Sequence, residues 1–307
     1  MLCLGIDTSN YTSSAALFDS ESGEIIQSRQ LLPVKEGELG LRQSDAVFQH
    51  ILLLPEMIKN VFSESSKKID RIGVSVSPRD EKGSYMPCFN TGKAIAESIA
   101  AVNGVPLFHF SHQAGHIAAA LYSSGKTELF TQEFIAFHVS GGTTEAVKVT
   151  PDSKKVFSAE MLSFSLDLKA GQAIDRVGKL LGLSFPAGMM LDKLSLESDR
   201  KYKIKPYMKD GCCSLSGLQN KCEKMLADNE KKEDIAKYCI DFISQALYEM
   251  TACIRDKYPD LPLLYSGGVM SNTLIRKRFS EEFGAVFAAP GFSSDNAAGT
   301  AVLASKV

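Results

Sequence analysis

Two histidines four residues apart are the part of this chain best suited to metal chemistry. His112 and His116 follow an apolar run, residues 106–110, which predicts a β-strand. If a helix begins near Ser111, residues four apart share one helix face, so both imidazoles can reach one metal ion. The alternative is a polar helix start whose histidines meet only water. The spacing alone leaves both interpretations open.

A carboxylate near the end of the chain could complete such a site. Asp295 lies in the stretch Ser-Ser-Asp-Asn-Ala-Ala, residues 293–298, directly before a predicted last helix. It could be an ordinary N-cap, since Ser and Asp are common at helix starts. It could also join the histidines in a two-histidine, one-carboxylate site with open positions for a substrate oxygen, as iron(II) and catalytic zinc prefer. Sequence spacing alone cannot bring the three residues together.

Three turns of small residues each follow a predicted strand. They are Asp-Thr-Ser at 7–9, Ser-Gly-Gly at 140–142 and Ser-Gly-Gly at 266–268. Small side chains let backbone N–H groups approach phosphate oxygens, and ligands of open α/β sheets collect at the carboxyl ends of strands. One such turn is often an ordinary hairpin. Three at equivalent points favour a nucleotide site.

The elements that must position these residues occur in a repeated order. In the first half, strands are expected at 2–6, 13–18, 25–32 and 72–76, with helices at 46–62 and 92–102. In the second half, strands are expected at 134–139, 145–149, 155–161 and 261–265, with helices at 170–181, 218–228 and 233–258. Pro55 should kink the first helix or start a new one. The repetition predicts a duplicated α/β unit with a cleft between the copies.

Composition limits the classes of partner. The 307 residues predict about two domains, and the formal net charge of −2 gives no global attraction to nucleic acid or membranes. A polyanion would have to use local basic runs such as 200–205 or 276–278, which are more often solvated surface.

The cysteines and the apolar runs point to a cytoplasmic protein. None of the seven cysteines forms a Cys-x-x-Cys pair, which argues against a zinc ribbon. Their apolar surroundings are typical of buried thiols in a reducing compartment. No signal peptide is visible and no apolar segment reaches about 18 residues, so we expect no membrane association.

Seven motifs, in this order, resemble the TsaD family, the universal tRNA adenosine threonylcarbamoyltransferases once described as glycoproteases. They are HQAGH at 112–116, VSGG at 139–142, AIDRVGKLLG at 173–182, PAG at 186–188 with Asp192, CSLSGL at 213–218, GGVMSN at 267–272 and SDNAA at 294–298. Each motif is modest alone, but the ordered combination is specific. The resemblance extends from residue 2 to about residue 304.

The resemblance implies roles for individual residues. His112, His116 and Asp295 correspond to the family's metal ligands, usually for iron or zinc. The loop that meets the acyl-adenylate corresponds to Val139, Ser140, Gly141 and Gly142. The residues that hold the nucleotide and its threonyl part correspond to Asp175, Gly188, Asp192 and Asn272. Without the resemblance, Asp175 and Asp192 would be interpreted as solvent-exposed helix residues or as helix caps.

The same resemblance implies a fold, a reaction and partners. The fold is the actin-like ATPase (ASKHA) fold of two ribonuclease-H-like domains with a central cleft, here expected at 1–110 plus 289–307 and at 111–288. The reaction transfers a threonylcarbamoyl group from threonylcarbamoyl-AMP to the exocyclic amine of tRNA adenosine 37. The implied cofactors are one divalent metal, iron(II) or zinc, and an adenylate donor or ATP in the cleft. The implied partners are tRNA, a smaller TsaB-like paralogue and a TsaE-like P-loop ATPase.

Several motifs depart from the family pattern. Its Cys-Asp-Glu or Cys-Asp-Asp stretch is replaced by Asn10-Tyr11-Thr12, and Thr143 stands where a histidine is usual. Its Asp-Asp-Ala-Ala-Gly-Glu run reads Asp-Leu-Lys-Ala-Gly-Gln at 167–172, and its Gly-Pro-Gly-Leu loop reads Ser-Pro-Arg-Asp at 77–80. Replacing carboxylates with neutral or basic groups changes the local field. Metal and nucleotide binding are therefore better supported than the tRNA reaction.

Two alternatives remain open from the sequence. A divergent paralogue could bind metal and nucleotide but carbamoylate another acceptor, or the chain could be a catalytically silent partner subunit. The intact trio of metal-ligand residues argues against the silent subunit. Sugar-kinase chemistry would need a carboxylate base with Mg²⁺ rather than paired histidines. Peptidase activity lacks the Glu of a His-Glu-x-x-His motif.

Overall fold

The computed structural model describes all residues except 10, 35–40, 66 and 294–296, so Asn10 and Asp295 lie outside the described residues. The chain divides into two compact units. Unit 1 contains residues 1–132, 150–159 and 291–307, and unit 2 contains 133–149 and 160–290. The expected domains differ from this division, because helix α3 (His112–Ser123) packs against α9 (Ala298–Lys306) and belongs to unit 1.

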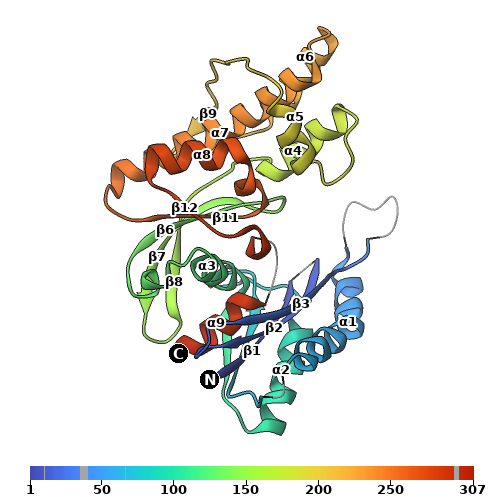
Figure 1. The fold of residues 1–307 in the computed structure, drawn as a ribbon, viewed down its shortest axis with the longest axis vertical. Coiled ribbons are helices and arrows are strands. Elements are labelled where there is room, and N and C mark those ends of the chain that lie inside the picture. The colour runs from blue at the N-terminus through green and yellow to red at the C-terminus, as the bar shows by residue number, and fades with distance from the viewer. Residues whose placement is uncertain (10, 35–40, 66, 294–296) are drawn as a thin grey trace. The chain divides into compact units, whose positions relative to one another are not determined.

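Unit 1 is built on a five-stranded sheet of order β3-β2-β1-β4-β5 (Figure 1). The strands are β1 (Leu2–Ser9), β2 (Thr12–Asp19), β3 (Ile25–Leu31), β4 (Arg71–Ser77) and β5 (Leu107–Ser111). β1, β2 and β3 form an antiparallel meander, and β4 and β5 continue the sheet parallel to β1. The carboxyl ends of β1, β4 and β5 therefore meet at one edge, where ligands of such sheets collect.

Helices on both faces bury this sheet. α1 (Gln43–Ser63) and α2 (Phe89–Asn103) supply Leu54, Met57 and Ala96 to the apolar core around β1 and β4. α9 packs against β1, where a Cβ on Gly5 would lie 2.2 Å from the Ala297 carbonyl oxygen. Only glycine permits this approach of helix and strand backbones. α1 runs through Pro55 as one helix, so no new helix starts there as the sequence had allowed.

Unit 2 repeats the same sheet. Its order is β12-β11-β6-β7-β8. The strands are β6 (Phe134–Val139), β7 (Thr144–Asp152), β8 (Val156–Phe164), β11 (Leu263–Ser266) and β12 (Val286–Phe287). β6 pairs antiparallel with β7 and parallel with β11, as β1 does with β2 and β4. The identical pairing order confirms the duplicated α/β unit predicted from the sequence.

Helices cover the unit 2 sheet around the long α7. They are α4 (Ala170–Leu180), α5 (Gly188–Ser195), α6 (Gly217–Ala227), α7 (Lys232–Lys257) and α8 (Thr273–Phe283). A short hairpin joins β9 (Tyr207–Lys209) to β10 (Cys212–Ser214) beside α7. The core contains Ile243, Leu247 and Met250 of α7 with Phe137 and Tyr265, whose rings stack 4.5 Å apart. The sequence did not predict α5 or the hairpin.

The short 3-10 turns are η1 (Thr127–Thr131), η2 (Gly268–Ser271) and η3 (Pro290–Phe292). Within the described part of the chain, no helix has the length and apolar character needed to cross a membrane.

Candidate functional site

The predicted strand-to-helix junction is present in unit 1. β5 ends at Ser111 and α3 begins at His112. The Ser111 hydroxyl accepts a hydrogen bond from the Ala114 N–H at 3.1 Å, which caps the helix. This cap fixes the first turn of α3, and both histidines lie on the face that the first two turns share.

The two imidazoles meet at their Nε2 atoms. His112 Nε2 and His116 Nε2 are 2.9 Å apart, with the rings edge to face. His112 Nδ1 lies 2.8 Å from Asp7 Oδ2 at the carboxyl end of β1. The Asp7 side chain is 1% exposed, whereas His112 retains 20%. A carboxylate can only accept here, so Nδ1 carries the proton, and His112 Nε2 then accepts the hydrogen bond from His116 Nε2.

Asp7 is itself held in place at the carboxyl end of β1, opposite Ser14 of β2. Its Oδ1 accepts the Ser9 N–H at 2.9 Å, and Ser14 donates its hydroxyl to the Asp7 carbonyl. Residues 7–9 were predicted as a turn, but they are the last residues of strand β1 and pair with β2. From this strand end, Asp7 orients a histidine. The sequence did not predict this partnership, because residues 7 and 112 become neighbours only through the parallel sheet.

Asp295 cannot be placed, since it lies outside the described residues. The helix that follows it does approach the histidines. Gly299 of α9 packs against Gly115 of α3, where a Cβ on Gly299 would lie 1.8 Å from the Gly115 carbonyl oxygen. Within the described ranges, no set of three His, Cys, Asp or Glu side chains is arranged to hold a metal ion.

A further buried histidine lies close to the end of β1 that contains Asp7 and Ser9. His50 of α1 is fully buried, and neither of its ring nitrogens has a hydrogen-bond partner in the described part of the chain. Burial lowers the pKa of His50, although the Asp7 charge and the Ser9 backbone act in the opposite direction. The hydroxyls of Ser13 and Thr91 are likewise buried and unpaired within that part. Sequence reasoning missed His50, since a lone histidine on a helix carries no motif.

The loop from Val139 to Gly142 forms a tight turn in unit 2. Ser140 N–H donates to the Thr143 carbonyl at 2.7 Å, and Thr143 N–H donates to the Ser140 hydroxyl at 3.2 Å. Gly141 and Gly142 are exposed with open space at their Cα positions. Backbone N–H groups of such an open turn can approach an anion.

The other small-residue turn of unit 2 packs directly on this loop. Gly267 has a φ of +97°, and a Cβ there would lie 2.2 Å from the Val139 carbonyl oxygen. On its other side, a Cβ on Gly171 of α4 would lie 2.6 Å from the Gly141 nitrogen. The residues 139–142 and 266–268 are therefore brought together, as the equivalent strand positions predicted.

Asp192 and Asn272 are direct partners. Asn272 donates from Nδ2 to Asp192 Oδ1 at 2.7 Å, and its Oδ1 accepts the Ile275 N–H at 3.0 Å as the N-cap of α8. Thr273 donates its hydroxyl to Asp192 Oδ2 at 3.0 Å. Both predicted residues thus lie together, but their polar atoms already have protein partners.

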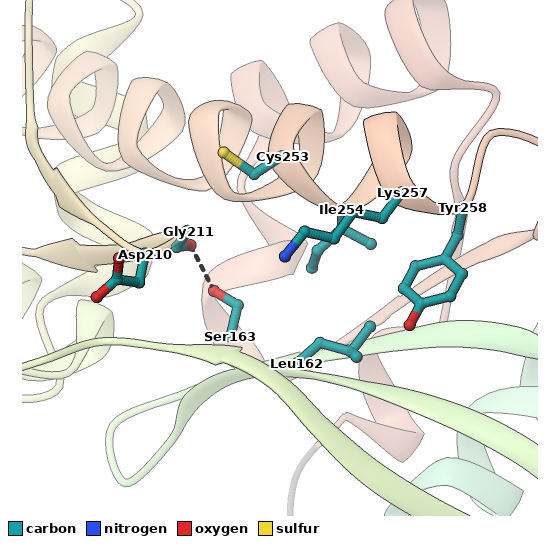
Figure 2. Close-up of a pocket in the computed structure, with 8 residues that line it drawn as sticks. All are labelled: Leu162, Ser163, Asp210, Gly211, Cys253, Ile254, Lys257 and Tyr258. Atoms are coloured by element: carbon teal, nitrogen blue, oxygen red, sulfur yellow. Dashed lines mark hydrogen bonds between the residues drawn. The ribbon is translucent and has the colours of Figure 1, made fainter.

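Asp175 supports the segment that leads into α5. Its Oδ1 accepts the Ala187 N–H at 2.9 Å, next to Gly188. α4 contacts both α5 and η2, so Asp175 and Gly188 belong to the same part of unit 2 as Asn272. Unit 2 also contains a small cavity of about 70 Å³, but none of the predicted site residues lines it (Figure 2).

Comparison with known proteins identifies the family. Residues 24–302 match the family model described as TsaD, tRNA N6-adenosine threonylcarbamoyltransferase. The chain belongs to the TsaD family. Membership supports a transferase acting on tRNA, in agreement with the motif order of the sequence.

Solved structures establish the fold. Full-length HypF in a phosphate- and nucleotide-bound form has a TM-score of 0.64 at 14% identity over 99% of this chain, but this chain spans only 55% of that protein. The component A of (R)-2-hydroxyglutaryl-CoA dehydratase from Acidaminococcus fermentans has a TM-score of 0.58 at 15% identity, covering 100% of this chain and 98% of that chain. The ROK hexokinase from Thermus thermophilus has a TM-score of 0.55 at 15% identity, with coverage of 100% and 98%. The predicted actin-like ATPase fold is thereby confirmed.

Proposed function

We propose that this TsaD-family protein transfers a threonylcarbamoyl group from threonylcarbamoyl-AMP to the exocyclic amine of adenosine 37 in tRNA, and that a metal ion held by His112, His116 and Asp295 is required. The observation that carries the proposal is the convergence of two imidazole Nε2 atoms 2.9 Å apart in a chain of this family. Iron(II) or zinc is the metal that such ligands favour.

The residues around the histidines fit a metal ligand set. Asp7 fixes the His112 tautomer from the Nδ1 side, which is the usual arrangement behind a metal-bound histidine. His116 lies one turn along the same helix with its Nε2 next to that of His112, so one ion could replace the hydrogen bond between the two nitrogens. When bound, the metal supplies Lewis-acid polarisation of the carbamoyl carbonyl.

The unit 2 residues fit the binding of the adenylate donor. Gly141 and Gly142 offer backbone N–H groups to the phosphate, which leaves with AMP. We assign Val139 and Ser140 to the same loop. Asp192 and Asn272 would bind ribose or threonyl polar groups by exchanging part of their mutual hydrogen bonding for the ligand.

Further components belong to this proposal. Asp175 and Gly188 would shape the nucleotide site through the segment that leads into α5. A smaller TsaB-like paralogue and a TsaE-like ATPase would assist turnover, and the protein would act in the cytoplasm.

The experiment is nucleoside mass spectrometry of unmodified tRNA incubated with the protein, candidate partners and threonylcarbamoyl-AMP generated in place. Wild type should form threonylcarbamoyladenosine and His112→Ala should not. His109→Ala is the matched control, because His109 is an exposed histidine on β5 three residues away. Equal product from wild type and His112→Ala would refute the metal site, and no product from metal-loaded wild type would refute the tRNA reaction.

A further inference from the structure

The chain has two basic runs, and their side chains behave differently. Both residues 200–205 and residues 276–278 belong to unit 2. At the sequence level they are equivalent, since each could be solvated surface or a polyanion contact. The partners of each cation distinguish them.

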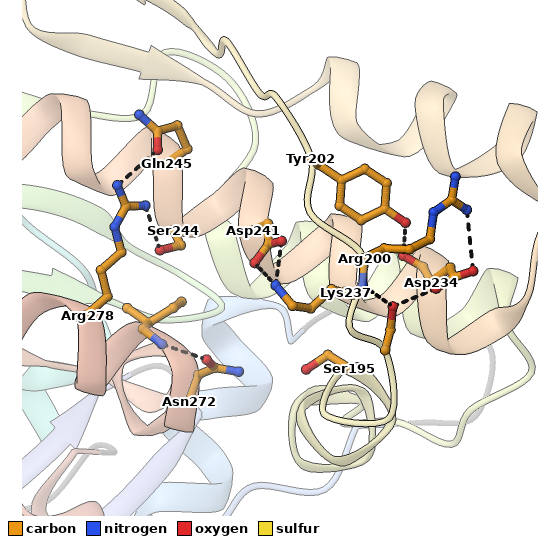
Figure 3. A network of polar contacts seen from close by, with 12 residues as sticks. Ser195, Arg200, Tyr202, Asp234, Lys237, Asp241, Ser244, Gln245, Asn272 and Arg278 are labelled. Atoms are coloured by element: carbon orange, nitrogen blue, oxygen red, sulfur yellow. Dashed lines mark hydrogen bonds and ion pairs between the residues drawn. The ribbon is translucent and has the colours of Figure 1, made fainter.

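The run at 276–278 uses its guanidinium groups inside the protein. Arg278 donates to Gln245 and Ser244 (Figure 3). It also donates to Glu282 and covers the Tyr248 ring at 4.3 Å. Arg276 lies over the Phe287 ring at 4.8 Å. These contacts hold α8 against α7 and β12, so this run is structural.

The first residues of the run that begins at Arg200 are held by contacts with α7 and with Glu230, which precedes it. Arg200 pairs with Asp234, and the Tyr202 hydroxyl donates to the Asp234 carbonyl at 2.9 Å (Figure 3). Arg200 also pairs with Glu230. The Tyr202 ring packs edge to face against Tyr238 of α7. Arg200 therefore neutralises the acidic side chains under the segment and fixes its first residues.

Beyond that anchor, burial alternates with a period of two. Tyr202, Ile204, Pro206 and Met208 turn inward and are buried or half-buried. The residues between them are exposed, namely Lys201, Lys203, Lys205, Tyr207 and Lys209. None of the side-chain ammonium groups of these four lysines has a hydrogen bond or ion pair with any residue that the structure describes. We name these five exposed residues the lysine row.

We propose that the lysine row is the surface that docks the phosphate backbone of RNA on this protein, which, resting on the proposed function, is the tRNA substrate. Alternate residues of an extended chain lie roughly 6–7 Å apart, which is comparable with the spacing of successive phosphates along an RNA strand. Free ammonium groups bind phosphates as point charges and release counterions. Tyr207, 63% exposed, offers a ring face for base stacking.

RNA fits this surface better than an anionic membrane does. The overall charge of −2 provides no general attraction to anionic surfaces, so the contact must be local. A membrane-binding segment presents apolar side chains to the bilayer, whereas Tyr202 and Met208 of this segment pack against the core of unit 2. Asp199 and Asp210 flank the row and limit its length.

The experiment measures binding of unmodified tRNA to the full chain by fluorescence anisotropy over a series of salt concentrations. Replacing Lys201, Lys203, Lys205 and Lys209 with Gln should weaken binding about 10- to 100-fold at roughly 0.1 M salt and lower the slope of log affinity against log salt by about 3. Changing the same four lysines to Arg should preserve binding. Tyr207→Ala should weaken binding about tenfold, and Tyr207→Phe should not.

The matched control changes Lys68, Lys82, Lys154 and Lys277 to Gln, which removes the same charge from four exposed lysines scattered over the surface. Equal loss in the control and the row variant would mean a general charge effect and overturn the proposal. So would unchanged tRNA affinity in the row variant, absent tRNA binding by wild type, or lysine-dependent binding to phosphatidylserine vesicles without tRNA binding. Wild type that binds tRNA through the lysine row but forms no threonylcarbamoyladenosine would refute the proposed reaction and leave the docking surface standing.

Discussion

The histidine cluster of unit 1 and the Asp192–Asn272 network of unit 2 differ in how their polar atoms are used. In unit 1, one carboxylate orients His112 from behind, and the Nε2 atoms of two histidines face each other. In unit 2, the amide of Asn272 is saturated at both ends, by Asp192 and by the first turn of α8. In the first arrangement, a metal could replace the hydrogen bond between the two imidazole nitrogens. In the second, a ligand would have to replace hydrogen bonds that also cap α8 and support the fold.

This difference predicts how each region responds to substitution. Removing either histidine should abolish metal binding with little loss of folding stability. Helix α3 is still held by its Ser111 cap and by its packing on α9. Removing the Asn272 side chain should lower both folding stability and adenylate binding, because its amide atoms also cap α8 and bond to Asp192. A stability measurement beside a binding measurement therefore separates the two regions.

The largest effect is expected for His116→Ala. Loss of one of two histidine ligands should lower metal affinity by more than about 100-fold, since the remaining ligands cannot replace the nitrogen. The thermal midpoint without metal should change little, because His116 is half-buried on a helix otherwise packed through alanines. Metal analysis after dialysis and a melting curve test both statements, and full metal retention would exclude His116 as a ligand.

Asp7→Asn is the next largest. An amide can present its NH₂ to His112 Nδ1 and reverse the tautomer, so metal affinity should fall about 10- to 100-fold while the ligands remain. The check is a competition titration of metal against a chelator, with Asp70→Asn as the control carboxylate on unit 1. Equal affinity in Asp7→Asn and wild type would show that Asp7 does not position His112.

The sequence predicted the parts of this molecule that depend on local pattern. Apolar periodicity identified the strands of both sheets, and the His-x-x-x-His spacing placed two imidazoles on one helix face. The approach of Asp7 to His112 was not predictable, because parallel strands β1, β4 and β5 bring together residues 105 positions apart. Of the two effects expected at Pro55, a new helix does not occur, since α1 continues through it.

The same limit applies to the basic runs. Both runs could be recognised in the sequence, but only the contacts of Arg276 and Arg278 show that the side chains of one run bind other residues of the protein. Likewise, the duplicated sheets were predicted from element order, whereas helix α5, which carries Asp192, has only eight residues and was not predicted. Charge and periodicity identify candidates, and the partners of each side chain decide between them.

Asn272→Ala should have a moderate effect on both properties. The free energy of unfolding should fall by about 1–2 kcal/mol through loss of the α8 N-cap and of the bond to Asp192. Under the proposed function, adenylate affinity should fall too. Asn272→Ser separates the two, because serine can cap the helix but cannot reach Asp192 as the amide does. Unchanged adenylate affinity in a calorimetric titration of both variants would leave Asn272 with a capping role alone.

The smallest predicted effect is the contribution of His50, close to the end of β1, to the pH dependence of stability. It is near zero at neutral pH. Burial lowers its pKa in the folded protein, so the unfolded chain binds the proton more readily. Stability linked to His50 is therefore constant above the unfolded pKa of about 6.5 and is lost as the pH falls below it, toward the lowered folded pKa. Urea unfolding at pH 8 and pH 5.5 should show a larger drop for wild type than for His50→Leu. An equal loss of stability in wild type and His50→Leu would mean that His50 takes up its proton as easily in the folded protein as in the unfolded chain. The end of β1 that contains Asp7 would then not require His50 to be neutral.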